Sequence, residues 1–150
     1  MEIAKLSMIT DDIISSKPLF HKAFGRPFFP SSNITPGAYY VLLQLSAEGE
    51  LSMSEIGERL SISKPNVTTL IDKLIEEGLT ERLADKQDRR IVKIKLTKKG
   101  AGFVEKNKKI YRNQINEKLL TLSEKELEKF VASLHNIKAI LTKISKSKNQ

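Results

Sequence analysis

With 150 residues, the chain is long enough for one domain whose hydrophobic core needs no disulfide or metal to hold it together. It has no cysteine, which excludes disulfide frameworks, thiol catalysis and cysteine-based redox sensing. A formal net charge of +8 favours a polyanionic partner, while the lack of a signal peptide or a long apolar run predicts a cytoplasmic protein with no membrane association.

The first part of the chain predicts two helices separated by an irregular connection. Apolar residues recur at helical spacing from 3 to about 24, and Pro18 lies inside this pattern, where we expect it to kink or interrupt the helix. Prolines and small polar residues in 25–37 indicate a loop. Thr35, followed by a proline, predicts the N-cap of a second helix that continues to about Ala47.

The next segment predicts two short capped helices in tight succession. Ser52 and Glu55 have the spacing of a capping box, which opens a helix ending near residue 60. After a connection of three residues, Ser63 is expected to cap a helix over 64–77. Two such helices are typical of a helix-turn-helix. The second helix has an apolar face made of Val67, Leu70, Ile71, Leu74 and Ile75.

A basic β-hairpin is predicted after these helices. Apolar and polar residues alternate over 91–96, which indicates a strand, and residues 79–83 can form its partner across the polar tip 84–90. Residues 82–99 contain eight Lys or Arg and two Asp, whereas residues 51–78 contain three basic and five acidic residues. Positive charge is therefore concentrated on the hairpin and on the start of the helix that follows.

The C-terminal third predicts two long helices. Thr97 caps the first, which extends to roughly Leu120, and Ser123 with Glu126 forms a second capping box. The last helix has apolar residues in heptad spacing, which indicates packing against another helix, either of the same chain or of a partner subunit. We interpret this surface as a dimer interface formed by Leu127, Phe130, Leu134, Ile137, Leu141 and Ile144.

The order of elements predicts a mainly α fold with a small β-hairpin wing. Its core is a winged helix-turn-helix over residues 35–100, which binds DNA, and residues 1–34 and 101–150 form a helical dimerisation region. In such a fold the second helix of the helix-turn-helix enters the major groove and the wing contacts the backbone or the minor groove. The residues expected to contact DNA are Ser63, Lys64, Asn66, Thr68, Thr69, Lys73, Arg89 and Arg90.

Individual side chains suggest particular contacts, each with an alternative. Asn66 can pair with an adenine edge, and Thr68 and Thr69 can meet a thymine methyl or a phosphate. For all of these the alternative is a solvated helix face. The lysines at 93, 95, 98 and 99 fit a solvated surface or phosphate contact equally well. His21 and His135 are far apart in sequence, so we expect no metal site and no cofactor.

Two motifs together resemble those of the MarR family of transcription regulators. The helix-turn-helix resembles that family over LSMSEIGERLSISKPNVTTLIDKLIEEGLTER, residues 51–82. Asp88-Arg89-Arg90 followed by Leu96-Thr-Lys-Lys-Gly100 resembles its wing signature, Asp-x-Arg and then Leu-Thr-x-x-Gly. The motif match extends over roughly residues 35–100.

The resemblance implies a homodimer that binds a pseudo-palindromic operator in double-stranded DNA, usually as a repressor. It also implies that Arg90 enters the minor groove and that an aspartate of the recognition helix, here Asp72, orients it; Asp88 is the other candidate partner. The alternative functions are a winged helix for protein assembly and a nucleic-acid-binding protein without sequence preference. No catalytic motif is present, so we expect no enzyme.

Aromatic residues gather in sequence around the predicted loop after the first helix. Core packing explains such a cluster, and a pocket for a small aromatic or apolar effector is the alternative hypothesis, motivated by the family's usual ligand sensing. The residues concerned are Phe20, Phe24, Phe28, Phe29, Tyr39 and Tyr40.

Overall fold

A computed structural model of the chain describes residues 2–27, 29 and 32–146. Phe28 of the predicted aromatic cluster, and residues 1, 28, 30–31 and 147–150 of the predicted dimerisation region, lie outside them. The chain divides into two compact units, one with the residues up to Arg112 and one from Asn113 onward. In the described part of the chain, no helix is both long enough and apolar enough to cross a membrane.

Helix α1 spans Glu2–Phe24 and contains Pro18 in its interior. Of the two effects expected of Pro18, a kink or an interruption, the interruption is excluded: proline removes one backbone donor, but the turns before and after it remain helical. Helix α2 spans Pro36–Glu48, and the Thr35 hydroxyl caps it by accepting the Ala38 N–H at 3.2 Å. The predicted start of this second helix is confirmed.

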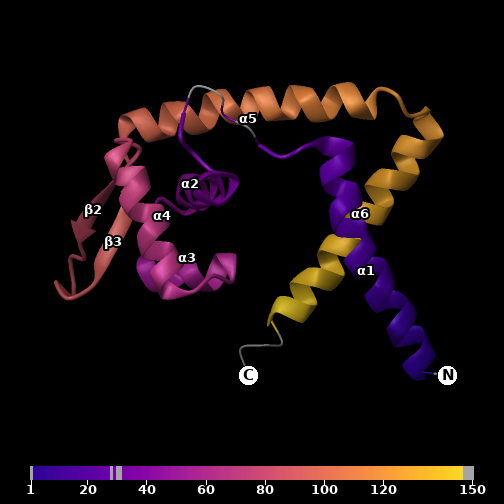
Figure 1. Ribbon diagram of the computed structural model, residues 1–150, viewed down its shortest axis with the longest axis horizontal. Coiled ribbons are helices and arrows are strands. Elements are labelled where there is room, and N and C mark those ends of the chain that lie inside the picture. The colour runs from indigo at the N-terminus through magenta and orange to yellow at the C-terminus, as the bar shows by residue number, and fades with distance from the viewer. Residues whose placement is uncertain (1, 28, 30–31, 147–150) are drawn as a thin grey trace. The chain divides into compact units, whose positions relative to one another are not determined.

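The wing is part of a three-stranded antiparallel sheet (Figure 1). Its strands are β1 (Glu50–Ser52), β2 (Thr80–Ala84) and β3 (Val92–Leu96), in the order β1-β3-β2. The predicted hairpin is confirmed as β2 and β3, whereas β1 was not foreseen. Leu51 of β1 pairs with Ile94 of β3, so the short strand joins the base of the wing to the start of the helix-turn-helix.

The helix-turn-helix consists of α3 (Met53–Leu60) and α4 (Lys64–Glu76). The predicted capping box opens α3, since the Ser52 N–H donates to Glu55 Oε2 at 2.7 Å and the Glu55 N–H donates to Ser52 Oγ at 3.3 Å. Between the helices Ser61 adopts the left-handed conformation, with φ of 52°. This conformation closes the tight turn that the sequence predicted.

Helix α5 spans Lys98–Leu119 and α6 spans Glu124–Lys146. The capping box before α6 is confirmed, because the Ser123 N–H donates to Glu126 Oε2 at 2.8 Å. None of the described α6 residues is buried. Helix α6 therefore has no core of its own within the described chain.

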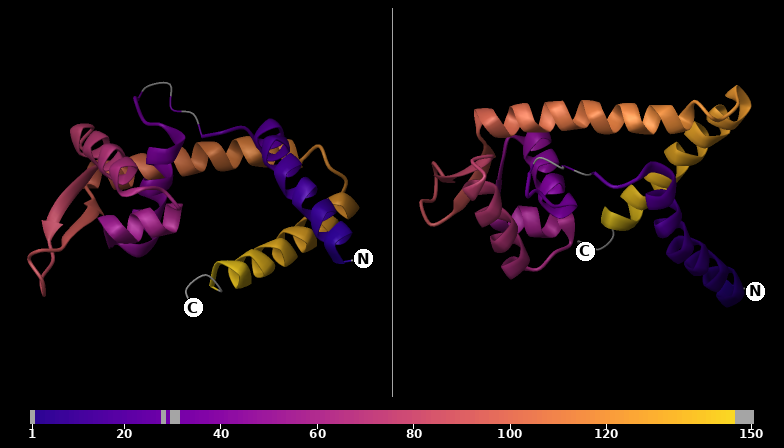
Figure 2. Two further views of the ribbon diagram at one scale, coloured as in Figure 1. Left: turned by 60° about the horizontal axis from the view of Figure 1, so that its bottom comes forward. Right: turned by 45° about the horizontal axis from the view of Figure 1, so that its top comes forward.

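The hydrophobic core of the first unit lies where α2, α3, α4, β3 and the start of α5 meet. The β2–β3 hairpin extends away from these helices (Figure 2). Apolar side chains from each element are fully buried in this core, which fixes the orientation of α4 relative to the sheet. They include Leu42, Ile56, Val67, Ile71, Leu74, Ile94 and Val104.

Candidate nucleic-acid interface

Helix α4 is anchored by one apolar face and exposes a polar face. Val67, Ile71 and Leu74 are fully buried, and Leu70 and Ile75 are partly buried against the same core, as predicted. The opposite face carries polar groups of both signs and little net charge, which suits recognition of base edges better than pure attraction to phosphate. Lys64, Asn66, Thr69 and Asp72 are exposed on the remaining surface, and Thr68 and Lys73 are half-buried.

The start of α4 is held close to α3 by a glycine. A Cβ atom on Gly57 would lie 3.2 Å from the Ile62 carbonyl oxygen and 3.3 Å from Val67 Cγ2, closer than most side chains allow. Ser63 is the N-cap residue, but its side chain makes no capping hydrogen bond, so the predicted cap is wrong in this respect. An N-cap side chain accepts a hydrogen bond from the backbone N–H two or three residues later. Two residues after Ser63 stands Pro65, which has no backbone N–H.

The end of α4 is joined to the start of α5 by side chains of the Leu-Thr-Lys-Lys-Gly segment. Thr97 Oγ1 donates to the Gly78 carbonyl at 2.7 Å, and Lys99 Nζ donates to the Glu77 carbonyl at 2.6 Å. A cation at a helix C-terminus stabilises the helix through its unpaired carbonyls. Lys99 is therefore engaged in helix capping, although both it and Lys98 are exposed.

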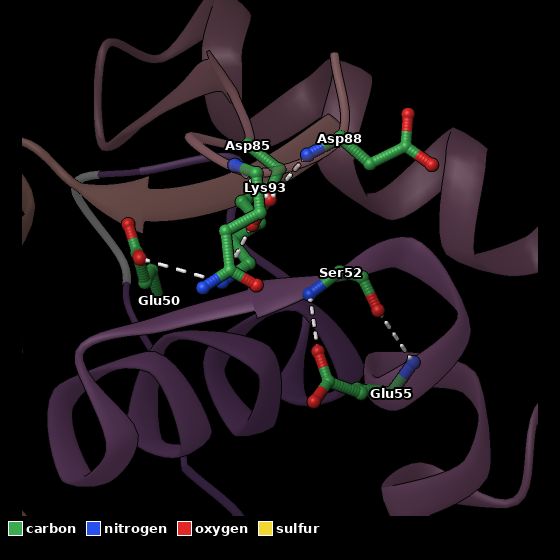
Figure 3. A network of polar contacts seen from close by, with 7 residues as sticks. Glu50, Ser52, Glu55, Asp85, Asp88 and Lys93 are labelled. Atoms are coloured by element: carbon green, nitrogen blue, oxygen red, sulfur yellow. Dashed lines mark hydrogen bonds and ion pairs between the residues drawn. The ribbon is translucent and has the colours of Figure 1, made fainter. Parts of the chain in front are cut away.

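Two aspartates shape the tip of the wing (Figure 3). The Asp85 carboxylate accepts the N–H groups of Gln87 at 2.8 Å and Asp88 at 3.0 Å, and Asp88 in turn accepts the Arg90 N–H at 3.0 Å. The Asp88 N–H, followed by the Lys93 ammonium, lowers the pKa of Asp85 to about 2. From the sequence, Asp85 was expected only to lie in a polar tip. The signal for such a turn is an aspartate whose side chain can accept the backbone N–H groups two and three residues later.

The lysines of β3 are paired with acids rather than free. Lys93 Nζ lies 2.9 Å from Asp85 Oδ2 and 3.5 Å from Glu50 Oε1, so it links the wing tip to β1 (Figure 3). Lys95 Nζ lies 3.1 Å from Glu81 Oε1. The sequence left these lysines between a solvated surface and phosphate contact, and their ion pairs with acids favour a surface role for Lys93 and Lys95.

The arginines at the tip are exposed. The Arg90 side chain is 95% exposed, and its Nε lies 3.9 Å from Asp88 Oδ1, while Arg89 is also exposed. Asp72 has a different partner from the one that the resemblance implied: Arg82 NH2 donates to Asp72 Oδ1 at 2.6 Å. Arg82 lies on β2 beside α4, whereas Arg90 lies at the far end of the hairpin. Asp88 is therefore the closer partner of Arg90.

The predicted aromatic cluster divides into two groups. Phe29 and Tyr39 pack in the core with ring centroids 4.7 Å apart, and both contact Phe103 of α5, which is not part of the predicted cluster. Phe20 and Phe24 form a separate pair on α1, with centroids 6.0 Å apart. Core packing accounts for the first group.

The heptad residues of α6 become more exposed toward the C-terminus. Leu127, Phe130 and Leu134 are half-buried. The later members have exposed fractions of 48% for Ile137, 56% for Leu141 and 53% for Ile144. Helix α1 is similar, since large apolar side chains such as Leu6 and Ile13 are 59% and 57% exposed.

Comparison with known proteins finds the same segment. The model of the MarR family matches residues 34–92, which hold the helix-turn-helix and most of the wing. The repressor MdtR of Bacillus subtilis, an HTH-type transcriptional repressor, is 30% identical over 95 residues, which are 62% of this chain and 61% of that protein. The chain thus spans less than two thirds of this relative's length.

Solved structures share the fold over almost the whole chain. The transcriptional regulator BldR from Sulfolobus solfataricus is 25% identical, with a TM-score of 0.71 over 93% of this chain and 98% of that one. FabT of Streptococcus pneumoniae, solved in complex with DNA, is 20% identical, with a TM-score of 0.68 over 94% and 95% of the two chains. The family match and these relatives show that residues 34–92 form a winged helix-turn-helix similar to that of MarR-family regulators.

Proposed function

We propose that this chain is a sequence-specific transcription regulator of the cytoplasm, which binds a pseudo-palindromic operator as a homodimer and represses transcription. The N-terminal half of α4 enters the major groove, and the tip of the wing enters the adjacent minor groove. The proposed DNA contacts are Ser63, Lys64, Asn66, Thr68, Thr69 and Lys73 of the recognition helix and Arg89 and Arg90 of the wing.

The observation that carries this proposal is the distribution of exposed positive charge. The two tip arginines are exposed on a turn that Asp85 and Asp88 hold in shape, whereas the β3 lysines are paired with acids. A narrow minor groove attracts inserted arginines. The polar face of α4 and this tip belong to the same compact unit, so this unit offers both groove-directed charge and base-directed polar groups. MdtR is named a repressor and FabT was solved with DNA, which agrees with this function.

A matched pair of substitutions tests the wing. Arg90→Ala should weaken binding to an operator recovered from a randomised pool by about 5- to 150-fold. It should also lower the slope of log binding constant against log salt concentration by about one, which corresponds to one phosphate contact. Lys95→Ala removes the same charge from a residue already paired with Glu81, and should leave both quantities nearly unchanged. Binding is measured by fluorescence anisotropy at several salt concentrations. Equal losses in the two variants would contradict the proposed role of the tip.

The homodimer is supported by the apolar surface of α6. Its exposed residues Ile137 and Leu141 lie one turn apart and, in the described chain, α6 has no buried residue. Ile137→Glu with Leu141→Glu should convert a dimer into a monomer of 16.9 kDa by light scattering. Lys138→Glu, a charge change on the same turn, should leave the dimer intact. A wild-type monomer would contradict the dimeric assembly.

Release of the operator by a small aromatic or apolar effector completes the proposal. Phe20 and Tyr40, which are 44% and 43% exposed, provide aromatic surface outside the buried Phe29–Tyr39 pair. Isothermal titration with aromatic carboxylates should produce heat, and saturating ligand should weaken operator binding. Titrations without heat would count against this class of effector.

A further inference from the structure

The hydroxyl of Thr69 is turned toward its own helix. Its Oγ1 donates a hydrogen bond to the Pro65 carbonyl at 3.1 Å, although the residue is exposed on the outward face of α4. A threonine hydroxyl has one hydrogen to donate, so Thr69 has none left for a phosphate oxygen or for a base acceptor. The Cγ2 methyl is the part of the side chain that remains to face outward.

Pro65 extends this apolar spot. It is exposed and lies one helical turn before Thr69, so the two side chains are neighbours on the same face. Thr68 differs, because it is half-buried toward the side of the helix, with its hydroxyl donated to the Lys64 carbonyl at 3.1 Å. The middle of the outward face of α4 therefore presents the Thr69 methyl group and the Pro65 ring. The neighbouring positions on this face carry charged or amide side chains.

Only one group on the major-groove edge of the bases is apolar, the 5-methyl of thymine. We propose that Thr69, together with Pro65, recognises a thymine methyl in each half-site of the operator. This inference rests on the proposed function and specifies which chemistry the recognition helix selects. Of the two contacts that the sequence left open for Thr69, thymine methyl or phosphate, the internal hydrogen bond favours the methyl.

Asn66 indicates what lies next to that thymine. It is exposed and three residues before Thr69, so it lies beside the apolar spot on the helix surface. A side-chain amide pairs with the N6 and N7 groups of adenine. We therefore expect A·T pairs in the half-site next to this part of α4, with an adenine that pairs with Asn66 and a thymine methyl that contacts Thr69.

The test replaces single thymines of the selected operator by deoxyuridine, which deletes the methyl and keeps base pairing unchanged. At one symmetric position, loss of each methyl should weaken binding about fourfold, or about 15-fold with both half-sites changed. Thr69→Ser should lose most of the preference for thymine over uracil, and Thr69→Val should retain that preference. Thr10→Ser on α1 makes the same change away from α4 and should behave as wild type.

The outcomes separate this inference from the proposed function. A defined operator whose uracil versions all bind as tightly as the thymine version overturns the role of Thr69 and leaves the regulator intact. The same holds if Thr69→Ser keeps the full preference for thymine, as it would if Oγ1 accepted a hydrogen bond from a cytosine or adenine amino group. Recovery of no operator overturns the proposed function and this inference with it.

Discussion

Replacing Gly100 by alanine should disrupt the packing of the start of α5 against Leu79, just after the recognition helix, and destabilise the protein. A Cβ atom there would lie 1.9 Å from the Leu79 carbonyl oxygen and 2.9 Å from the Leu79 carbonyl carbon. Both are backbone atoms, so no flexible side chain can move aside. Ordinary contact begins near 3.4 Å, and α5 would have to move away from Leu79 by roughly 1.5 Å.

The cost of Gly100→Ala follows from that displacement. Overpacking of this kind costs about 1–3 kcal/mol. The shift also stretches the hydrogen bonds from the Thr97 N–H to the Leu79 carbonyl, 3.1 Å, and from the Thr97 hydroxyl to the Gly78 carbonyl, 2.7 Å, each of which contributes about 1 kcal/mol. The higher helix propensity of alanine offsets about 1 kcal/mol. We expect a net loss of about 2–4 kcal/mol in the free energy of unfolding.

Gly102→Ala is the matched control in the same helix. A Cβ atom there meets nothing within 4 Å, so alanine should raise the stability by about 0.5–1 kcal/mol. Urea unfolding is followed by circular dichroism at one protein concentration, because dimerisation makes stability depend on concentration. A Gly100→Ala protein as stable as wild type, or equal losses in both variants, would refute the reasoning.

Two further predictions concern buried and charged groups of the sheet. Thr80 is 2% exposed and its hydroxyl has no hydrogen-bond partner within the described residues, so Thr80→Val should leave the free energy of unfolding unchanged or raise it by about 1 kcal/mol; a loss of that size in urea unfolding would contradict this. The pKa of Asp85 is lowered to about 2, so its carboxylate should hold the wing turn at every pH above the ordinary value of 3.8 and release it as the pH falls through about 2. The amide signals of Gln87 and Asp88 in NMR spectra should therefore stay constant from pH 7 to 4, and a midpoint near 3.8 would show that the turn does not lower this pKa.

Local sequence signals predicted most of the fold. The capping boxes at Ser52 and Ser123 and the N-cap at Thr35 act within three residues of the helix start, so the sequence contains all the groups that form them. The apolar stripe of α4 was equally visible, because burial of one helix face imposes a fixed spacing. These local signals located the recognition helix, and the alternation of apolar and polar residues over 91–96 located the wing.

The features that the sequence did not predict depend on contacts between distant residues. Strand β1 has three residues and exists because Leu51 pairs with Ile94. The partner of Asp72 depends on how β2 lies against α4, so the resemblance suggested Arg90 where the structure has Arg82. Whether Lys93 and Lys95 are free likewise depends on acids of neighbouring strands.

The central claim is that two copies of the chain, related by a two-fold axis, each use α4 and the wing to recognise one half-site of a specific DNA sequence. Selection of binding sites from a randomised DNA pool at near-physiological salt, followed by light scattering of the complex, tests it most directly. We expect a pseudo-palindromic consensus bound by one dimer. Recovery of no consensus, with affinity that collapses as salt rises, would contradict the claim and indicate binding through charge alone.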